Sequence, residues 1–428
     1  LKPDFGVIGE GEETIIELLD CLDRKMDVKG VNGIIYSGNE GKVVFTKLRE
    51  SIKNIDSLPF PDFEGLGFEE QLRNMSFNNA PYGCIFDYPR VYSILCSRGC
   101  PFQCTFCYHC LGLKYRIRSL DNIMKELENA IKKYKINVIS IYDDLFSVDK
   151  QRLYDFCKRI KKLSNEISQE IKWTCQLSVI NVDKEMLETL KDAGCYSISY
   201  GFESYSSIVL KSMKKPITPQ QIDNAIKLTM QYGLAIQGNF IFGDIAETKE
   251  TAKETLDYCK KNCMGQVNLG FIQPYPGSEI YNYCVKKGII KNKLSFIKND
   301  LPITNWLNMT EKMTDDEVLQ LKKEILETRT KYVKYITPLK IKKDKSNKNQ
   351  DRYELLIKCP FCNEEIHYKN FFLTGNRFYN DLTSCKNCHM RFHIASPLYK
   401  FALKHYQRLD LFRKSFLRLK SNFLKKKI

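Results

Sequence analysis

The sequence predicts an α/β protein whose main domain is a partial barrel of six parallel strands, followed by a small cysteine-rich module. Between residues 90 and 275, short apolar runs alternate with amphipathic stretches. This alternation is typical of parallel strands joined by right-handed crossover helices. Near residues 360 and 386, two Cys-x2-Cys pairs stand apart from that pattern and indicate a separate metal-binding module.

The composition sets the broad class. The chain has 428 residues, enough for two or three domains, with 43% hydrophobic and 28% charged residues. It has no apolar run of about eighteen residues, so we expect no transmembrane span. It starts Leu-Lys-Pro-Asp, without the charged-then-apolar start of a signal peptide. We therefore expect a fragment or trimmed form of a cytoplasmic protein.

The net charge of +16 is high. Such a charge can attract nucleic acid or an anionic membrane. However, the Lys and Arg residues are spread along the chain and concentrate only near the C-terminus. A solvated basic surface is the simpler interpretation, and both binding alternatives stay open.

Residues 1–85 have the pattern of the end of one domain and a linker. Residues 4–22 read as a short strand, a Gly-rich turn and a helix, and residues 31–46 read as a hairpin around Gly-Asn-Glu-Gly. Residues 57–66 are punctuated by proline and read as an extended connector.

Residues 86–335 should form the partial (β/α)6 TIM-like barrel with a trailing helix at 311–335. We expect strands at 91–96, 137–143, 171–178, 196–202, 234–243 and 266–273, and helices at 119–134, 149–164, 183–193, 218–232 and 247–262. In barrels of this type, the chemistry sits in the loops that follow the C-terminal ends of the strands. The loop after the first strand is rich in cysteine, so it should lie on that functional rim.

The last hundred residues divide into three parts. Residues 336–352 are charged and read as a linker, residues 353–396 hold the cysteine-rich module, and residues 397–428 form a basic tail. In the tail, apolar side chains recur at helical spacing: Leu409, Phe412, Phe416, Leu419 and Phe423. This amphipathic helix could pack on a protein surface or dock peripherally on anionic lipid at the inner membrane face. The second option suits a lipid-linked substrate.

Seventeen cysteines are too many for a routine cytosolic protein, and disulfide scaffolds are small and secreted. In a reducing compartment, clustered cysteines more often bind metal. The module carries Cys359, Cys362, Cys385 and Cys388, the spacing of a zinc ribbon with a closed structural zinc site. A second iron–sulfur cluster is the rival interpretation. We expect the scattered cysteines to be mostly small buried hydrophobes.

Nearby side chains in the module have simpler expected roles. The basic residues Lys358, Lys386 and Arg391 could offset the charge of four thiolates. We expect the histidines His367, His389 and His393 to be surface or packing residues rather than ligands.

The opening loop presents Cys100-x3-Cys104-x2-Cys107. A structural zinc site requires four protein ligands, and a 4Fe–4S cluster is normally bound by four thiolates. Three thiolates would leave one iron open for substrate or cofactor. A zinc knuckle or a redox motif is the alternative from spacing alone. His109 and Cys110 adjoin the set as expected spectators, although Cys110 could be a reactive thiol.

The segment "CPFQCTFC" resembles the signature of radical SAM enzymes. The resemblance implies a 4Fe–4S cluster on Cys100, Cys104 and Cys107 whose open iron binds S-adenosylmethionine (SAM). One electron, from a donor such as flavodoxin or ferredoxin, then cleaves SAM to methionine and a 5′-deoxyadenosyl radical. Phe106 matches the aromatic position that packs near the adenine. The neighbouring Ser97-Arg98-Gly99 and Pro101 also match.

Later segments extend the resemblance over roughly residues 1–335. Asp143 and Asp144 follow the second strand and would accept hydrogen bonds from the SAM ammonium; a helix cap is the alternative. Glu203 ends the fourth strand, where the family has a SAM contact. Gly243 opens a turn that resembles Gly-x-Pro-x-Glu-Thr, and residues 273–281 resemble Pro-Tyr-Pro-Gly-Thr.

Three positions depart from the family's pattern. Ile245 replaces the usual proline of that turn, and Ser178 and Ile180 stand where we expect arginine and aspartate. These departures put polar contacts from the third strand in doubt, but not the cluster.

The N-terminal piece resembles the joint between a Rossmann-like cobalamin domain and a radical SAM barrel, with residues 9–12 as its last strand-to-helix turn. The usual Asp-x-His-x-x-Gly motif is absent, and the first histidine is His109. We therefore expect most of that domain to lie upstream of Leu1 or to be missing.

The resemblance implies cobalamin-dependent methylation of an unactivated carbon in a small-molecule or lipid-linked substrate. Two alternatives stay open. One is a radical cyclase or oxidoreductase without methyl transfer, and the other is a nucleic-acid-targeted modifying enzyme that binds through the zinc ribbon. A methylthiotransferase is disfavoured, because the N-terminal piece has no second set of three cysteines.

Overall fold

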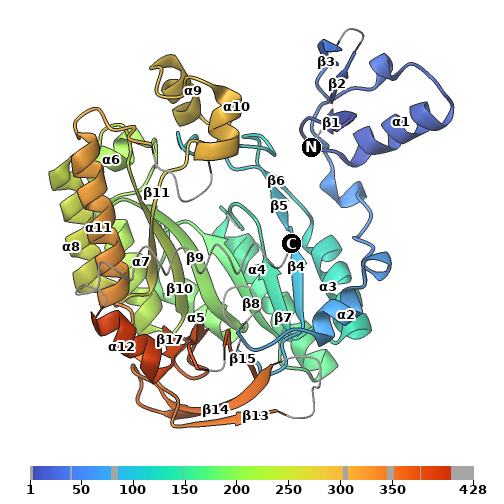
Figure 1. The fold of residues 1–428 in the computed structure, drawn as a ribbon. Helices are drawn as coiled ribbons and strands as arrows, with labels where there is room; N and C mark the ends of the chain where they lie inside the picture. The colour runs from blue at the N-terminus through green and yellow to red at the C-terminus, as the bar shows by residue number, and fades with distance from the viewer. Residues whose placement is uncertain are drawn as a thin grey trace.

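The computed structural model describes residues 3–38, 41–78, 85–146, 148–301, 307–344, 351–375 and 377–405. Its centre is one curved sheet of six parallel strands in the order β11-β10-β9-β8-β7-β4 (Figure 1). Consecutive strands are neighbours, as expected for repeated strand–helix units. The predicted partial barrel is confirmed.

The boundaries follow the sequence pattern closely. The strands are β4 (Val91–Ile94), β7 (Val138–Ile141), β8 (Lys172–Leu177), β9 (Cys195–Glu203), β10 (Ala235–Phe242) and β11 (Val267–Phe271). The helices between and after them are α3 (Leu120–Tyr134), α4 (Lys150–Ile167), α5 (Lys184–Asp192), α7 (Pro219–Gln231), α8 (Lys249–Asn262) and α11 (Asp315–Lys331). A Ser, Thr or Asp side chain caps the first turn of each of these helices.

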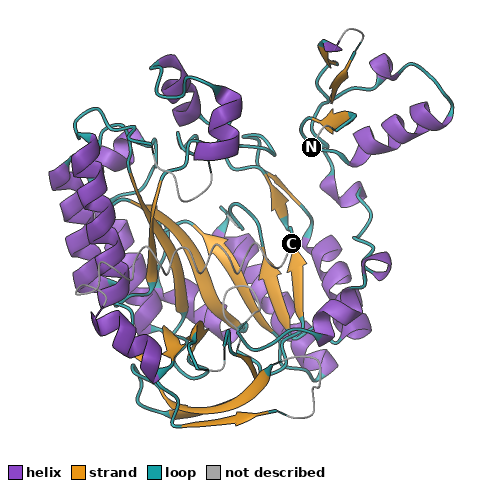
Figure 2. Ribbon diagram, viewed as in Figure 1, coloured by secondary structure: helices purple, strands orange, loops and turns teal. Residues whose placement is uncertain are grey.

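The two faces of the sheet differ in chemistry. One face packs against the helices through large apolar side chains such as Trp173, Tyr200 and Phe240. Figure 2 shows the helices gathered on this side of the sheet. The other face is concave and lines the barrel interior.

Several short elements lie at the C-terminal ends of the strands. These are β5 (Ser97–Arg98), β6 (Arg116–Ile117), α6 (Ser207–Ser212), α9 (Glu279–Lys286) and α10 (Lys293–Ser295). The strands β5 and β6 form a two-stranded antiparallel ribbon. The sequence pattern did not predict these elements, because each is too short to show a period.

The cysteine-rich module forms two small sheets at the opposite end of the barrel (Figure 1). One sheet has the order β12-β17-β16 and the other β13-β14-β15. Their bounds are β12 (Tyr335–Ile336), β13 (Lys340–Lys343), β14 (Arg352–Lys358), β15 (Glu365–Phe372), β16 (Asn380–Ser384) and β17 (Arg391–Ala395). The helix α12 (Pro397–His405) follows, and the tail from residue 406 lies outside the described residues.

The expected linker at 336–352 is wrong in part. Residues 340–343 form β13, which pairs antiparallel with β14. The sequence of β13 did not predict a strand, because all four residues are exposed and show no apolar alternation. Backbone pairing with β14 stabilises this strand.

The module shares a hydrophobic core with the barrel. Val91, Val138 and Tyr196, at the N-terminal ends of three barrel strands, pack in one cluster with Leu355 and Phe392 of the module. The module therefore covers the bottom of the barrel.

The N-terminal unit contains β1 (Phe5–Val7), α1 (Glu12–Asp23), β2 (Ile34–Ser37) and β3 (Val43–Phe45), followed by α2 (Phe68–Arg73). The predicted strand, turn, helix and hairpin are all present. The strands pair antiparallel in the order β1-β2-β3, whereas a Rossmann-like sheet is parallel. The predicted origin of this unit in a cobalamin domain stays a prediction.

Candidate active site

The three-thiol loop lies where the sequence placed it, just after β4 and at the C-terminal end of the sheet. The β5–β6 ribbon forms its base. Gly99 has a φ of +77°, and a Cβ at this position would lie 2.5 Å from the carbonyl oxygen of Lys114. The Gly before Cys100 is therefore required by close backbone approach.

The thiols influence one another electrostatically. Cys104 is buried, with 6% of its surface exposed, and Cys100 and Cys107 are half-buried. A hydrogen bond from Cys107 lowers the pKa of Cys104 to about 7, against burial, which raises it. The ammonium of Lys215 lowers it further. Burial raises the pKa of Cys100, and the hydrogen bond with Cys104 raises the pKa of Cys107. Of the three thiols, the loop therefore favours only Cys104 as a thiolate, the form that binds metal.

An ion pair faces the thiols. Glu203 ends β9, and its Oε1 lies 3.0 Å from Nζ of Lys215. Burial alone would lower the pKa of Lys215, but the charges of Glu203, Cys104 and Cys107 raise it above its ordinary value. A Cβ at Gly201 would lie 2.3 Å from the Glu203 carboxylate, so this glycine makes room for the pair.

Sequence reasoning predicted Glu203 but missed Lys215. Lys215 lies in the segment after α6, outside every motif, and only the fold brings it to the thiols. It supplies the positive charge that balances Glu203 and the thiolates.

The two predicted aspartates have different environments. Asp143 is fully buried, and its carboxylate accepts hydrogen bonds from the backbone N–H of Cys96 and the hydroxyl of Ser97, both at 2.6 Å. Burial raises its pKa to about 7. Asp143 therefore fixes the chain just before the loop. Asp144 is exposed, and its charge acts on Cys100, so it is accessible to a ligand.

The aromatic and glycine positions also lie at this end of the barrel. Phe106 packs with Ile241 and Ile245 against the apolar cluster around α9. Gly243 has a φ of +93°, and its N–H donates to the buried carboxylate of Glu247. The described structure thus gathers Phe106, Glu203 and Gly243 on the thiol rim.

The concave face below this rim is polar but uncharged over its middle. The aligned residues Ser93, Ser140, Thr174 and Ser197 form one row across neighbouring strands. The next row toward the rim consists of Gln176, Ser199 and Gln237. Above that row lie two exposed residues, Asn239 and Asn268, whose side chains share a 3.1 Å hydrogen bond. This face can hydrogen-bond a ligand without offering it a charge.

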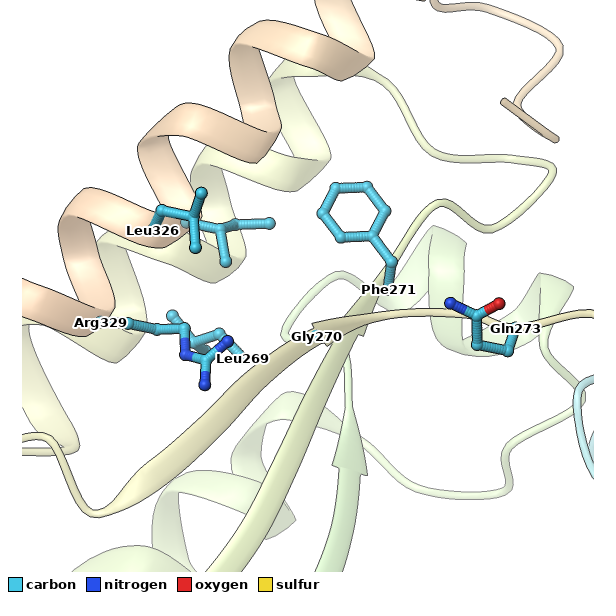
Figure 3. A pocket seen from close by; sticks show the side chains of 7 residues that line it. Leu269, Gly270, Phe271, Gln273, Leu326 and Arg329 are labelled. Carbon is cyan, nitrogen blue, oxygen red and sulfur yellow. The ribbon is translucent and has the colours of Figure 1, made fainter. Parts of the chain in front are cut away.

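A separate pocket of about 190 Å³ lies between β11 and α11. In Figure 3, Phe271 and Leu326 lie on its two sides, with Arg329 at its lower edge. No thiol of the described loop lines it, so it does not belong to the cysteine site.

The four module cysteines form a second site at the far end of the barrel. Their sulfurs all lie within 4.8 Å of one another, with Cys359 to Cys388 at 3.8 Å and Cys362 to Cys385 at 3.6 Å. Four sulfurs at 2.3 Å from a tetrahedral zinc ion are about 3.8 Å apart. The spacing therefore fits zinc.

Neighbouring side chains are engaged elsewhere. Lys386 contacts Asp87 at 2.6 Å, and Arg391 donates to the backbone of Gln266. His389 bonds to the Gly233 carbonyl oxygen and His393 to Asn380, each at 2.7 Å. These contacts agree with the packing role expected of the two histidines, and the charge-balancing role expected of Lys386 and Arg391 stays a prediction.

A parallel half-barrel with three thiols on its rim agrees with the iron–sulfur site that the sequence predicts there. Residues 94–259 match the family model of the Radical SAM superfamily. The chain thus contains a radical SAM domain, and members of this superfamily use a 4Fe–4S cluster and SAM.

Named relatives agree with this family. Over 322 residues the chain is 33% identical to an uncharacterized methyltransferase of Pyrococcus horikoshii, covering 74% of this chain and 63% of the relative. Over 284 residues it is 27% identical to the anaerobic magnesium-protoporphyrin IX monomethyl ester cyclase of Rubrivivax gelatinosus, covering 65% and 48%. The chain thus spans less than two thirds of the length of these relatives.

Among solved structures, the fold is similar to that of TsrM from Kitasatospora setae, a radical S-adenosylmethionine methyltransferase with cobalamin and a [4Fe-4S] cluster bound. The TM-score is 0.51 at 18% identity, covering 66% of this chain and 54% of TsrM. This likeness supports the fold.

Within the described residues, no helix has the length and apolar character needed to cross a membrane.

Proposed function

We propose that this chain is the radical SAM part of an enzyme that methylates an unactivated carbon with the help of cobalamin. The observation that carries the proposal is the three-thiol loop beside the Lys215–Glu203 pair on the barrel rim. The methyltransferase name of the Pyrococcus horikoshii relative supports the methyl transfer, and the cobalamin bound in TsrM supports the second cofactor.

The residues present fit the iron–sulfur cluster. Cys100, Cys104 and Cys107 would be its ligands, and Cys104 interacts electrostatically with both of the other thiols. The neighbouring Lys215 ammonium stabilises negative charge there. When bound, the cluster supplies the electron that cleaves SAM to methionine and a 5′-deoxyadenosyl radical.

The chain's own residues bind and orient SAM. Glu203 and the exposed Asp144 offer carboxylates to its ammonium group, while Lys215 offers an ammonium to its carboxylate. Phe106 and the turn at Gly243 provide an apolar wall suited to the adenine. Asp143 holds the chain just before the cysteine loop through its hydrogen bonds with Cys96 and Ser97.

The substrate carbon lies over the uncharged concave face. The rows of Ser, Thr, Gln and Asn side chains give it hydrogen-bond donors and acceptors, and the charged groups stay at the rim. The cysteine-rich module closes the bottom of the barrel, so the substrate enters from the rim. A small polar molecule, or the polar end of a lipid-linked one, suits this interior.

The module acts structurally. Its strands β14 and β15 lie at the opposite end of the barrel from β5 and β6 (Figure 1), and Cys359 and Cys385 belong to the core that the module shares with the barrel.

The test uses the full chain, purified and reconstituted without oxygen. We expect four irons per chain at the opening loop, one zinc at the module, and reductant-dependent formation of 5′-deoxyadenosine from SAM. With methylcobalamin and extract-derived substrate, label from [methyl-¹⁴C]-SAM should enter the product. A chain that binds no iron at residues 100–107 would refute the assignment.

A second candidate is radical cyclisation or oxidation without methyl transfer, favoured by the similarity to the Rubrivivax gelatinosus cyclase. SAM cleavage with substrate consumption but no methyl label in the product would select this candidate.

A further inference from the structure

A buried group of charges joins the N-terminal unit to the cysteine loop. Glu10 lies in the turn between β1 and α1, and only 4% of its side chain is exposed. Its Oε1 accepts a hydrogen bond from Nη1 of Arg98 and its Oε2 accepts one from Nη1 of Arg116, both at 2.8 Å. One carboxylate thus holds two guanidinium groups.

The remaining contacts complete this group. Oε2 of Glu10 also accepts from the backbone N–H of Ile52 at 2.7 Å, and Arg116 donates to the carbonyl oxygen of Ile52 at 2.6 Å. Arg98 reaches Glu12 with its second terminal nitrogen. Buried charges are tolerated only when paired and hydrogen-bonded in this way.

The two arginines occupy the base of the cysteine loop. Arg98 on β5 and Arg116 on β6 are partners in the same rung of the β5–β6 ribbon. The loop with all three thiols leaves from one of them and returns to the other. Arg116 also donates to the carbonyl oxygen of Leu111 within the loop, at 3.2 Å.

We propose that Glu10 is a positioning residue for the iron–sulfur site: from the N-terminal unit, it holds together the two ends of the loop that carries Cys100, Cys104 and Cys107. Two like charges meet on one rung; Glu10 pairs with both, and Glu12 supplies the second negative charge through Arg98. Without it, the guanidinium groups repel each other and the rung opens. The N-terminal unit thereby becomes part of the cluster site.

This inference rests on the proposed cluster at these thiols, and its test begins with the iron-free chain. Glu10→Gln removes the charge but keeps the side-chain size. Glu13→Gln is the matched control, since Glu13 pairs with Arg49 at 3.2 Å on the surface of the same unit. Hydrogen exchange of residues 98–118 should accelerate about tenfold in Glu10→Gln and stay unchanged in Glu13→Gln.

A second measurement uses the reconstituted protein. Glu10→Gln should hold several-fold less iron, and its electron paramagnetic resonance signal should respond less to added SAM. Zinc content reports on folding, because the module lies at the other end of the barrel. Glu10→Ala should show the same pattern more strongly.

The outcomes separate this inference from the proposed function. Wild-type protein without iron refutes the cluster, whereas unchanged loop exchange in Glu10→Gln refutes the positioning role alone. Loss of zinc together with iron in both Glu10 variants would make Glu10 a general folding residue and also overturn the proposal.

Discussion

Glu247 should make the stability of the barrel fall as the pH rises. The residue begins the turn into α8, is fully buried, and accepts a hydrogen bond from Gly243 with one oxygen. Its other oxygen has no hydrogen-bond partner among the described residues. Burial raises its pKa from 4.5 to about 8, and the neighbouring Asp244 adds to the rise.

The sign follows from this raised pKa. Below about pH 4.5 the carboxyl is protonated in both the folded and unfolded states and has no cost. As the pH rises from 4.5 through 8, the unfolded state ionises first, and the folded state loses relative stability. One pKa unit corresponds to about 1.4 kcal/mol, so the cost grows from about 1 kcal/mol at pH 5 to about 4 kcal/mol at pH 8.

Glu247→Gln removes this dependence, because the amide is neutral at every pH. Its melting temperature relative to wild type should rise by about 6 °C between pH 5 and pH 8, at roughly 2 °C per kcal/mol for a domain of this size. Calorimetry of the two proteins at both pH values measures this difference, and other titrating groups cancel in the subtraction.

Glu250→Gln, on an exposed residue in the first turn of the same helix, is the matched control and should show no such rise. If the gap between Glu247→Gln and wild type were constant from pH 5 to pH 8, Glu247 would not be held neutral by burial, and the reasoning would fail.

Three further predictions concern the metal sites. Cys104→Ala should abolish iron binding, while Cys110→Ser should keep full iron content in a colorimetric iron assay; equal iron loss in both would make Cys110 a ligand. Lys215→Met should weaken SAM binding about tenfold in equilibrium dialysis, because it removes a charge-assisted hydrogen bond. Lys214→Met, which changes the exposed neighbouring lysine, is the control and should leave SAM binding unchanged. Cys385→Ser should release zinc and lower the melting temperature of the whole barrel; a barrel transition that stays at its wild-type temperature would contradict the shared core.

Much of the fold could be predicted from the sequence, because the barrel repeats one pattern. Six apolar runs and their amphipathic partners have clear periods, so nearly all their boundaries agree with the structure to within a few residues. The site of the four module cysteines could also be predicted, because the spacing of two Cys-x2-Cys pairs indicates a four-sulfur metal site. Short elements such as α6 and β13 have no period, and β13 is stabilised by its partner strand rather than by its own residues.

The site was predicted less completely, because several of its features depend on tertiary contacts. Lys215 stands in no motif, and only the return of the chain after α6 brings it to Glu203. Asp143 matched the expected position, yet its carboxylate points back to Cys96 and Ser97. The role of Glu10 required two segments separated by almost ninety positions to meet, which a single sequence cannot reveal.

The burial of the thiols has a practical consequence for anyone handling this protein. Apart from the two metal-binding sets, seven of the described cysteines are buried, and only Cys21 and Cys110 are accessible to any extent. Dissolved oxygen or an alkylating reagent will therefore reach the partly open Cys100, Cys107 and Cys110 long before the interior. An aerated sample can lose its redox centre and still give a native circular dichroism spectrum, so a well-folded preparation is no proof of a competent one.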